Sequence, residues 1–258
     1  KDDIYCIIIE PYSASNLLSI SPEFIRELKN ICENEKIILI FDEVYSGWAK
    51  TGKLFYFMYF ENIVPDILTF SKSFGGGKSS ISGYACRDKF YEKAYNNIDN
   101  FNLHSTTYNA FGEEAVTAIE AINIIIEDEY CNKAKNIEKK TFKKLNDLKI
   151  KYPDIIRDVR GVGALMGIKL NNNINIFEKF RNLLPFKILS ERTIERVYLA
   201  SIIKHMYEQH NILLTFTMNK DQCLLIAPSL IVKDEDIEYL ASSLDKTFKL
   251  GLAKLVLN

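Results

Sequence analysis

Short apolar runs and one amphipathic stretch alternate in the first ninety residues of the chain. Residues 5–10 and 37–41 are almost wholly apolar and rich in β-branched side chains, which is typical of buried strands. Between them, Ser21 followed by Pro22 is a helix start signal, and apolar residues then recur at helical spacing as far as Cys32. This order predicts a βαβ unit, so we expect a mostly parallel sheet that is buried on both faces.

The pattern changes in the second half of the chain. From about Gly112 the apolar spacing becomes helical and continues past Lys140, which predicts one long helix linking two domains. Asp234 is a candidate cap for the last helix. Further elements are expected on the same grounds: strands at 67–70, 81–86, 163–170, 212–216 and 223–226, and helices at 194–209 and 234–249.

These elements predict an α/β fold with a mostly parallel sheet, followed by a smaller α+β unit. We expect residues 1–130 to be part of a large domain and residues 131–258 to form a small C-terminal domain. The apolar segment 177–189 is assigned to neither strand nor helix, and an insertion of this kind can shape or cover a pocket. By Ile7 the chain is already inside a strand, so we expect it to be a piece of a longer protein, cut inside a domain.

Composition excludes several classes of function. The net charge of −1 is spread over interspersed acidic and basic residues, which argues against nucleic acid and membrane surfaces as partners. No apolar run approaches the roughly 20 residues that a membrane span needs. The five cysteines are irregularly spaced and the three histidines lack metal-ligand spacing, so we expect a reduced, cytoplasmic protein with no metal site.

Two strand ends carry residues with chemistry. Lys72 follows an apolar strand and precedes three glycines, and Asp42 directly follows residues 37–41. A buried lysine has the lowered pKa that imine formation needs, and a carboxylate at a strand end can pair with a pyridinium N–H. Together they indicate a pyridoxal phosphate site. The plainer interpretations are a surface turn for Lys72 and an N-cap or surface position for Asp42.

A hydroxyl-rich turn at 104–108 precedes the helical stretch. Thr106 and Thr107 there could hold a phosphate together with backbone N–H groups at the helix entry, although a simple N-cap cluster explains the residues equally well. His104 is more readily structural than catalytic.

Five ordered segments resemble those of the class III (ω-amino) aminotransferases, which are pyridoxal phosphate enzymes of fold type I. FDEV and YSGWAKTGKLF (41–55) resemble the family's DEV-x-[TS]-G-x-x-[RK]-TGK segment. PDILTFSKSFGGG (65–77) resembles its lysine segment, and HSTTY (104–108) its H-[GST]-[ST]-T-[FY] turn. RGVGALMGIKL (160–170) and CLLIAPSL (223–230) resemble two segments of its small domain. The chain is therefore interpreted as the C-terminal portion of such an enzyme.

The resemblance assigns roles to particular residues. Lys72 would form the Schiff base with the cofactor and move the proton, Asp42 would hold the pyridine nitrogen, and Val44 would pack on the ring face. Thr106 and Thr107 match the phosphate-binding turn, and Thr107 would serve the neighbouring subunit. This implies a homodimer with shared sites.

The resemblance also leaves gaps. Tyr45 stands where many relatives carry glutamine near the ring's 3-hydroxyl, and its O–H could act similarly. The family's glycine-rich phosphate cup and its stacking aromatic lie in an N-terminal half, so the N-terminal remainder of the same protein would be needed to complete the site.

The substrate-binding positions depart from the family. Leu225 occupies the place of the arginine that grips a substrate carboxylate in many members, and no arginine follows Arg196. No acid stands at Ser15 or Asn16, where many members place a glutamate that masks this arginine. Both partners are absent, so we expect substrates that are not gripped by an α-carboxylate: a diamine, an amino aldehyde or a carrier-tethered carbonyl.

Three other functions are compatible with parts of the pattern. An aminomutase, racemase or decarboxylase uses the same lysine and aspartate. A catalytically silent domain of a larger synthase would explain the altered substrate position but has no need of Lys72 and Asp42. A nucleotide-binding domain is disfavoured because GGGK at 75–78 lacks the spacing of a phosphate-binding loop.

Overall fold

Two compact units make up the chain in a computed structural model. The model describes residues 3–100, 102–107, 109, 111–171, 191–219 and 221–257. Unit 1 comprises Lys1–Ser13 and Ser19–Cys131, and unit 2 comprises Ala14–Leu18 and Asn132–Asn258. The apolar segment 177–189 lies outside the described residues.

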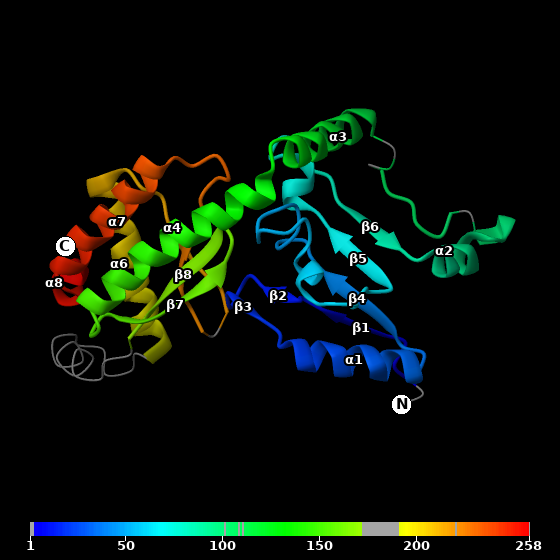
Figure 1. Ribbon diagram of the computed structural model, residues 1–258, viewed down its shortest axis with the longest axis horizontal. Coiled ribbons are helices and arrows are strands. Elements are labelled where there is room, and N and C mark those ends of the chain that lie inside the picture. The colour runs from blue at the N-terminus through cyan, green and yellow to red at the C-terminus, as the bar shows by residue number, and fades with distance from the viewer. Residues whose placement is uncertain are drawn as a thin grey trace. The chain divides into compact units, whose positions relative to one another are not determined.

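Unit 1 is built on a four-stranded sheet (Figure 1). The strands are β1 (Cys6–Ile9), β4 (Ile38–Asp42), β5 (Ile67–Phe70) and β6 (Gly83–Cys86), and they lie in that order. The first three are parallel and β6 is antiparallel, which confirms the prediction of a mostly parallel sheet. The other elements are β2 (Tyr12–Ser13), β3 (Leu18–Ser19), α1 (Pro22–Asn34), η1 (Tyr56–Tyr59), η2 (Lys72–Gly75), α2 (Asp88–Tyr95), η3 (Ile98–Asn100) and α3 (Gly112–Glu127).

Helix α1 begins where its sequence signal predicts. The Ser21 hydroxyl accepts a hydrogen bond of 3.1 Å from the Phe24 N–H, and Pro22 occupies the first turn. The buried side of the helix includes Ile25 and Cys32 and packs on β4.

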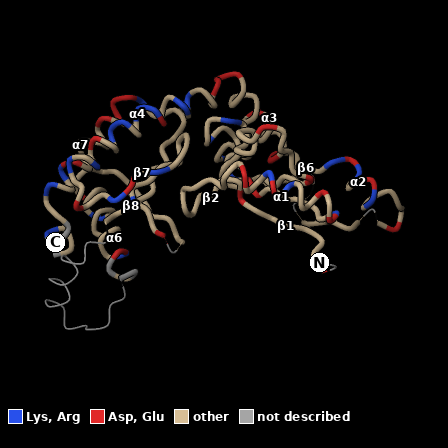
Figure 2. Tube along the Cα trace, turned by 60° about the horizontal axis from the view of Figure 1, so that its bottom comes forward, with Lys and Arg blue, Asp and Glu red and all other residues tan. Residues whose placement is uncertain are grey.

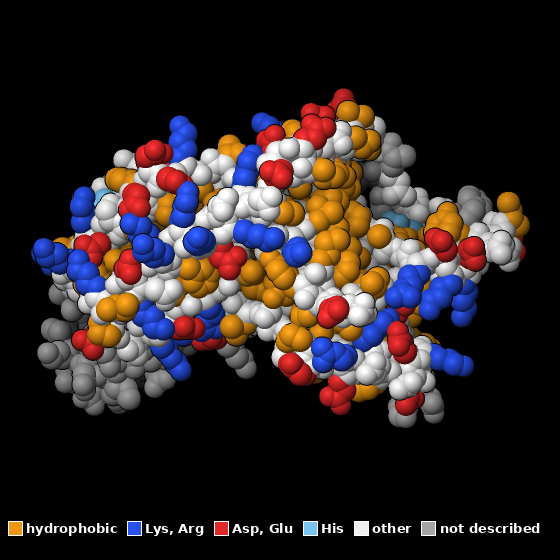
Figure 3. Space-filling model, viewed as in Figure 1, with side chains coloured by type: hydrophobic (Ala, Val, Ile, Leu, Met, Phe, Trp, Pro, Cys, Tyr) orange, Lys and Arg blue, Asp and Glu red, His pale blue; other side chains and the backbone are white. Residues whose placement is uncertain are grey.

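The described residues cover one face of the sheet and leave the other open, so burial on both faces stays a prediction. Leu39 and Phe41 on one face of β4 are fully buried. On the opposite face, Ile8, Ile40 and Ile67 lie in one row across three strands, and Ile8 is 60% exposed. Asp42 lies two residues after Ile40, so alternation places it on this open face. Figure 3 shows hydrophobic side chains gathered on the surface of unit 1 below α3.

The long helical stretch is two helices rather than one. Helix α3 ends at Glu127 and α4 (Tyr130–Lys151) begins three residues later. Between them, Asp128 caps α3 and Glu129 has a φ of +53°, a left-handed conformation that interrupts helical geometry. The apolar spacing continues across this break, which is why the pattern predicted a single helix.

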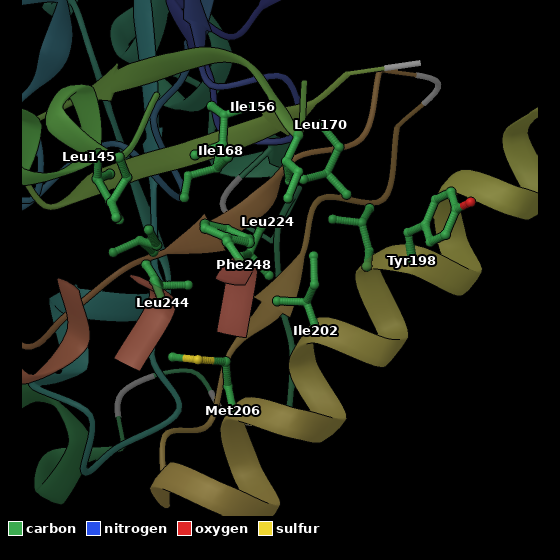
Figure 4. Packing of buried hydrophobic residues seen from close by; sticks show 14 of the residues in the cluster. Leu145, Ile156, Ile168, Leu170, Tyr198, Ile202, Met206, Leu224, Leu244 and Phe248 are labelled. Carbon is green, nitrogen blue, oxygen red and sulfur yellow. The ribbon is translucent and has the colours of Figure 1, made fainter. Parts of the chain in front are cut away.

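Unit 2 is a sheet covered by helices. Its strands are all antiparallel in the order β7-β8-β10-β9. Their bounds are β7 (Ile156–Val162), β8 (Leu165–Leu170), β9 (Thr215–Phe216) and β10 (Leu224–Ile226), and the remaining helices are α6 (Glu191–His210), α7 (Asp234–Lys249) and α8 (Leu252–Leu257). Figure 4 shows the core, where side chains from β8, β10, α6 and α7 converge around Ile168, Leu224 and Phe248.

Three sequence expectations for unit 2 need correction. Strand β7 was not predicted, because its charged residues hide the strand pattern. The strand expected at 212–216 is only the two residues of β9. Lys233, not Asp234, is the N-cap residue of α7, and its backbone N–H donates to the Asp236 carboxylate at 3.1 Å. Asp234 is instead the first residue inside the helix.

Basic and acidic residues are interspersed along the Cα trace of both units (Figure 2). Within the described residues, none of the helices combines the length and apolar character needed to cross a membrane. The same residues hold no group of three or more histidine, cysteine, aspartate and glutamate side chains that could bind a metal ion.

Candidate functional site

Asp42 and Lys72 lie at the same edge of the unit 1 sheet. Strands β4 and β5 are parallel neighbours, and Asp42 pairs in register with Thr69, three residues before Lys72. The Asp42 carboxylate accepts hydrogen bonds from the Thr69 hydroxyl at 3.4 Å and from the Val44 N–H at 3.0 Å. Carboxyl ends of parallel strands are where ligands bind in open α/β sheets. The structure therefore brings together the two residues on which the sequence prediction depends.

The Lys72 side chain is exposed, not buried as the sequence argument assumed. The lysine begins the short helix η2, just past the end of β5, and the described residues leave its amine open. Its Nζ lies 5.2 Å from the centre of the Tyr45 ring, which is a cation–π contact. Burial raises the pKa of the half-buried Tyr45 hydroxyl, so this phenol stays protonated at neutral pH.

Glu43 is a buried acid that sequence reasoning missed. It lies between Asp42 and Val44, is fully buried, and accepts hydrogen bonds from the Tyr56 N–H at 2.5 Å and the Phe57 N–H at 2.7 Å. Burial raises the pKa of its carboxyl, although these N–H donors act in the opposite direction. Glu43 thus ties the loop that follows β4 to η1. The available signal was an acid inside an otherwise apolar segment.

Thr106 and Thr107 are exposed in the loop between η3 and α3. The Thr106 hydroxyl donates to the Asn109 side chain at 3.1 Å, and the Asn109 N–H donates to the Thr106 carbonyl at 3.2 Å. These bonds are local to the turn, and among the described residues none joins the two threonines to Asp42 or Lys72. His104 lies beside Tyr84 of β6, with ring centres 6.2 Å apart.

In unit 2, Leu225 occupies the position at which the family resemblance looks for an arginine. It lies in β10 and pairs in register with Gly167 of β8. A Cβ atom added to Gly167 would lie 2.4 Å from the δ-carbon of Leu17, which is itself buried. Leu17 follows Ser15 and Asn16 in the same short segment. Leu17 and Leu225 therefore contribute hydrocarbon beside Gly167, while Arg160 of β7 pairs with Gly167 from the other side.

The cations near this position are already paired. Arg160 Nη1 lies 2.7 Å from the Asp221 carboxylate. The Lys169 side chain is 3% exposed, and its Nζ lies 2.5 Å from Glu195 and 2.8 Å from Asp221. Burial by itself would raise the pKa of the Asp221 carboxyl, but hydrogen bonds from Lys169 and Arg160 outweigh it and lower that pKa. This network neutralises both cations within unit 2, although the buried Arg160 Nε has no hydrogen-bond partner among the described residues.

The site in unit 1 fits a carbonyl-bearing, nitrogen-heterocyclic cofactor. It offers a reachable primary amine on Lys72, a carboxylate on Asp42 at the neighbouring strand end, and the open sheet face on which Asp42 lies. An amine condenses with an aldehyde, and a carboxylate stabilises a protonated ring nitrogen.

Comparison with known proteins identifies the family. The family model for aminotransferase class-III matches residues 1–248. An uncharacterized aminotransferase of Schizosaccharomyces pombe is 23% identical, over 90% of this chain and 45% of that protein. The aminotransferase PigE of a Serratia species is 26% identical, over 94% of this chain and 31% of that protein. The chain thus spans less than half the length of these two curated relatives.

Solved structures show the same fold. A transaminase from the marine bacterium Virgibacillus superposes with a TM-score of 0.80 at 21% identity, over 96% of this chain and 53% of that one. An ornithine aminotransferase from Plasmodium yoelii superposes with a TM-score of 0.74 at 23% identity, over 94% of this chain and 56% of that one. The fold-type assignment from the sequence is therefore confirmed.

Proposed function

The chain belongs to the class III aminotransferases, and from this membership we propose that the protein moves an amino group between an amine donor and a carbonyl acceptor. Enzymes of this family use pyridoxal 5′-phosphate. The observation that carries the proposal is the placement of Lys72 and Asp42 at adjoining ends of β5 and β4.

The residues of unit 1 would divide the chemistry between them. Bound pyridoxal phosphate supplies an electron sink that stabilises negative charge on the substrate carbon. Asp42 would hold the ring nitrogen in its protonated form, and Val44 would pack on the ring. The Lys72 amine would hold the cofactor's aldehyde and would serve as the base that moves the proton. The Tyr45 hydroxyl would donate a hydrogen bond to the cofactor.

We also propose a homodimer in which Thr106 and Thr107 bind the cofactor phosphate of the neighbouring subunit. What supports this is that both threonines are exposed, in a turn that precedes α3 and whose hydrogen bonds among the described residues stay within it. Hydroxyl and N–H groups at a helix entry are suited to phosphate.

The substrates we propose lack an α-carboxylate held by arginine. Leu225 places hydrocarbon where many family members carry that arginine, and the buried Leu17 lies next to the facing Gly167. Arg160 and Lys169 are neutralised by carboxylates within unit 2. An amino aldehyde, a diamine or a carrier-tethered carbonyl fits this apolar, charge-satisfied region better than a free α-amino acid.

The open face of the sheet supports a further part of the proposal. Ile8, Ile40 and Ile67 form an apolar row on the face that carries Asp42, and uncovered rows of this kind favour burial. The curated relatives are more than twice as long as the matched region. We propose that a part of the protein N-terminal to these 258 residues covers this face and completes a large domain with residues 1–130. Five free cysteines support a cytoplasmic location.

One labelling experiment tests the function. The purified protein is incubated with pyridoxal phosphate and reduced with borohydride, and its peptides are mapped by mass spectrometry. We expect the reduced cofactor on Lys72 and a visible absorbance band before reduction, both absent in Lys72→Ala. Asp42→Asn should keep the label but lose at least about 100-fold in turnover, because the ring nitrogen is no longer held protonated. An unlabelled Lys72 would favour a silent assembly domain instead.

A further inference from the structure

Lys72 has a backbone conformation that a residue with a side chain rarely adopts. Its φ is +51°, in the left-handed region, directly after Ser71 with an extended φ of −164°. Such strain persists only where the surrounding structure enforces it, and it concentrates at functional sites. The turn is anchored before the lysine by the Ser71 hydroxyl, which donates to the Ile81 carbonyl at 3.0 Å. The direction in which the Lys72 side chain leaves the sheet therefore depends on what holds η2.

Phe74 packs in a cluster of three aromatic rings that all contact one another. The Trp48 ring stacks on Phe74 at 5.0 Å between centres, with the planes 13° apart. The Phe70 ring meets Phe74 edge-on at 4.9 Å and 81°, and the Trp48 and Phe70 ring centres lie 5.5 Å apart. Since Phe74 lies two residues after Lys72 in η2, this cluster fixes the helical turn that carries the lysine.

Trp48 is itself rigidly placed. It is 7% exposed, its φ is +60°, and its backbone N–H donates to the Leu54 carbonyl at 2.6 Å. The indole N–H is buried without a hydrogen-bond partner among the described residues, so the ring acts here through its faces and not through its polar group. A phenylalanine keeps a flat stacking face at this position, whereas an aliphatic side chain does not.

Just after η2 the chain rests on α3. Gly76, the C-cap of η2, has a φ of +61°, and a Cβ atom added there would lie 3.0 Å from the Cβ of Ala121. The backbone of the glycine turn thus approaches the helix closely because both residues are small. A larger side chain in place of Ala121 would push the turn away from α3.

We propose that Trp48 and Ala121 are positioning residues for Lys72: the indole stack on Phe74 within η2 and the small contact between α3 and Gly76 just after it aim the amine toward the edge where Asp42 lies. Neither residue touches the reacting groups. The inference rests on the proposed role of Lys72. It differs from simple core packing, because it predicts a defect in the chemistry of one lysine in molecules that are fully folded.

The first pair of variants alters the stack. Trp48→Leu removes the aromatic face and Trp48→Phe keeps it. The readout is the rate at which pyridoxal phosphate is trapped on Lys72 by borohydride, measured by peptide mass spectrometry and normalised to the folded fraction from circular dichroism. We expect about tenfold slower labelling in Trp48→Leu, since displacement of a reacting group by about 1 Å costs up to about 100-fold, and rescue to within about twofold in Trp48→Phe.

The second pair alters the helix contact without disturbing the core. Ala121→Leu enlarges the side chain against Gly76, and Glu120→Leu introduces the same side chain at the neighbouring exposed position of α3. Leucine favours helices at either position. We expect Ala121→Leu to slow Lys72 labelling about tenfold and Glu120→Leu to leave it within about twofold. Ile25→Val on α1 is the control for a general loss of stability and should also label normally.

The outcomes separate the two proposals. Suppose that the wild-type protein is labelled at Lys72, and that Trp48→Leu and Ala121→Leu are labelled at the same rate as the wild type. The positioning role is then overturned while the proposed function stands. If Trp48→Phe is as slow as Trp48→Leu, stacking is not the means of positioning and that half of the inference is overturned. If the wild type does not label at Lys72, the proposed function is overturned, and the positioning role with it.

Discussion

At the scale of single residues, neighbours in sequence have separate tasks in the segment 42–45. Asp42 lies half-buried at the strand end, Glu43 is fully buried beneath the following loop, and Tyr45 lies beside the Lys72 amine. The sequence pattern identified Asp42 and Lys72, because a charged residue directly after an apolar strand stands out. Glu43 escaped it, because its partners are backbone groups of Tyr56 and Phe57, which no local pattern reveals.

Leu225 is the residue on which substrate preference should depend. We expect the wild-type protein to prefer an aldehyde acceptor over 2-oxoglutarate. Leu225→Arg should raise kcat/KM for 2-oxoglutarate, relative to the aldehyde, by about tenfold, because a charge-assisted hydrogen bond contributes about 1.5–3 kcal/mol. Steady-state kinetics with both acceptors measures this ratio.

Leu225→Met is the matched control, because it keeps the volume and adds no charge. Its acceptor ratio should equal that of the wild type. A wild-type protein that used glutamate and 2-oxoglutarate as its preferred pair, with low KM, would contradict the substrate proposal.

At the scale of elements, the sequence predicted what short-range patterns encode and missed what longer-range contacts decide. Strands β4 and β5 were predicted because uninterrupted apolar runs are typical of parallel strands. Strand β7 was missed because Arg157, Asp158 and Arg160 break the alternation, and ion pairs such as Arg160–Asp221 match the charges of Asp158 and Arg160. The break between α3 and α4 depends on the left-handed backbone conformation of Glu129, and no glycine or proline there marks it in the sequence.

The hairpin of β7 and β8 makes an element-scale prediction. Gly161 has a φ of +135°, and a Cβ atom there would lie 2.2 Å from the Leu165 carbonyl oxygen and 2.5 Å from the Met166 Cα. Both obstacles are backbone atoms, which cannot move aside without breaking the pairing. Gly161→Ala should therefore destabilise unit 2 by about 3 kcal/mol or more, as strain and overpacking add. Urea unfolding followed by circular dichroism measures the loss.

Gly112→Ala serves as the comparison for that variant. A Cβ atom at Gly112 meets no atom within 4 Å, and the residue opens α3. This substitution should leave stability unchanged or raise it by about 0.5–1 kcal/mol. If Gly161→Ala and Gly112→Ala change the free energy of unfolding equally, the hairpin tolerates the added carbon.

At the scale of the whole molecule, the proposed role of Thr107 in the neighbouring subunit's site gives the dimer a functional test. Copies carrying Lys72→Ala are mixed with copies carrying Thr107→Ala under conditions that allow subunit exchange. Each mixed dimer then holds one site with both residues intact. With random mixing, half of the dimers are mixed and half of their sites are intact, so about one quarter of wild-type activity should return.

Each variant alone should show almost none of this activity, which is the baseline for the mixture. Sedimentation velocity on the same samples verifies that exchange occurred. If exchange is complete and activity does not return, the two residues act within one subunit and the shared-site arrangement is wrong.

Trp48 is the one tryptophan among the 258 residues, and it lies in unit 1 against the turn that carries Lys72. The ultraviolet emission of this chain therefore originates almost entirely from a single place. Tryptophan fluorescence follows the unfolding of unit 1 alone, whereas circular dichroism sums over both units. Comparing the two signals in one denaturation series reveals whether the units unfold together or in succession.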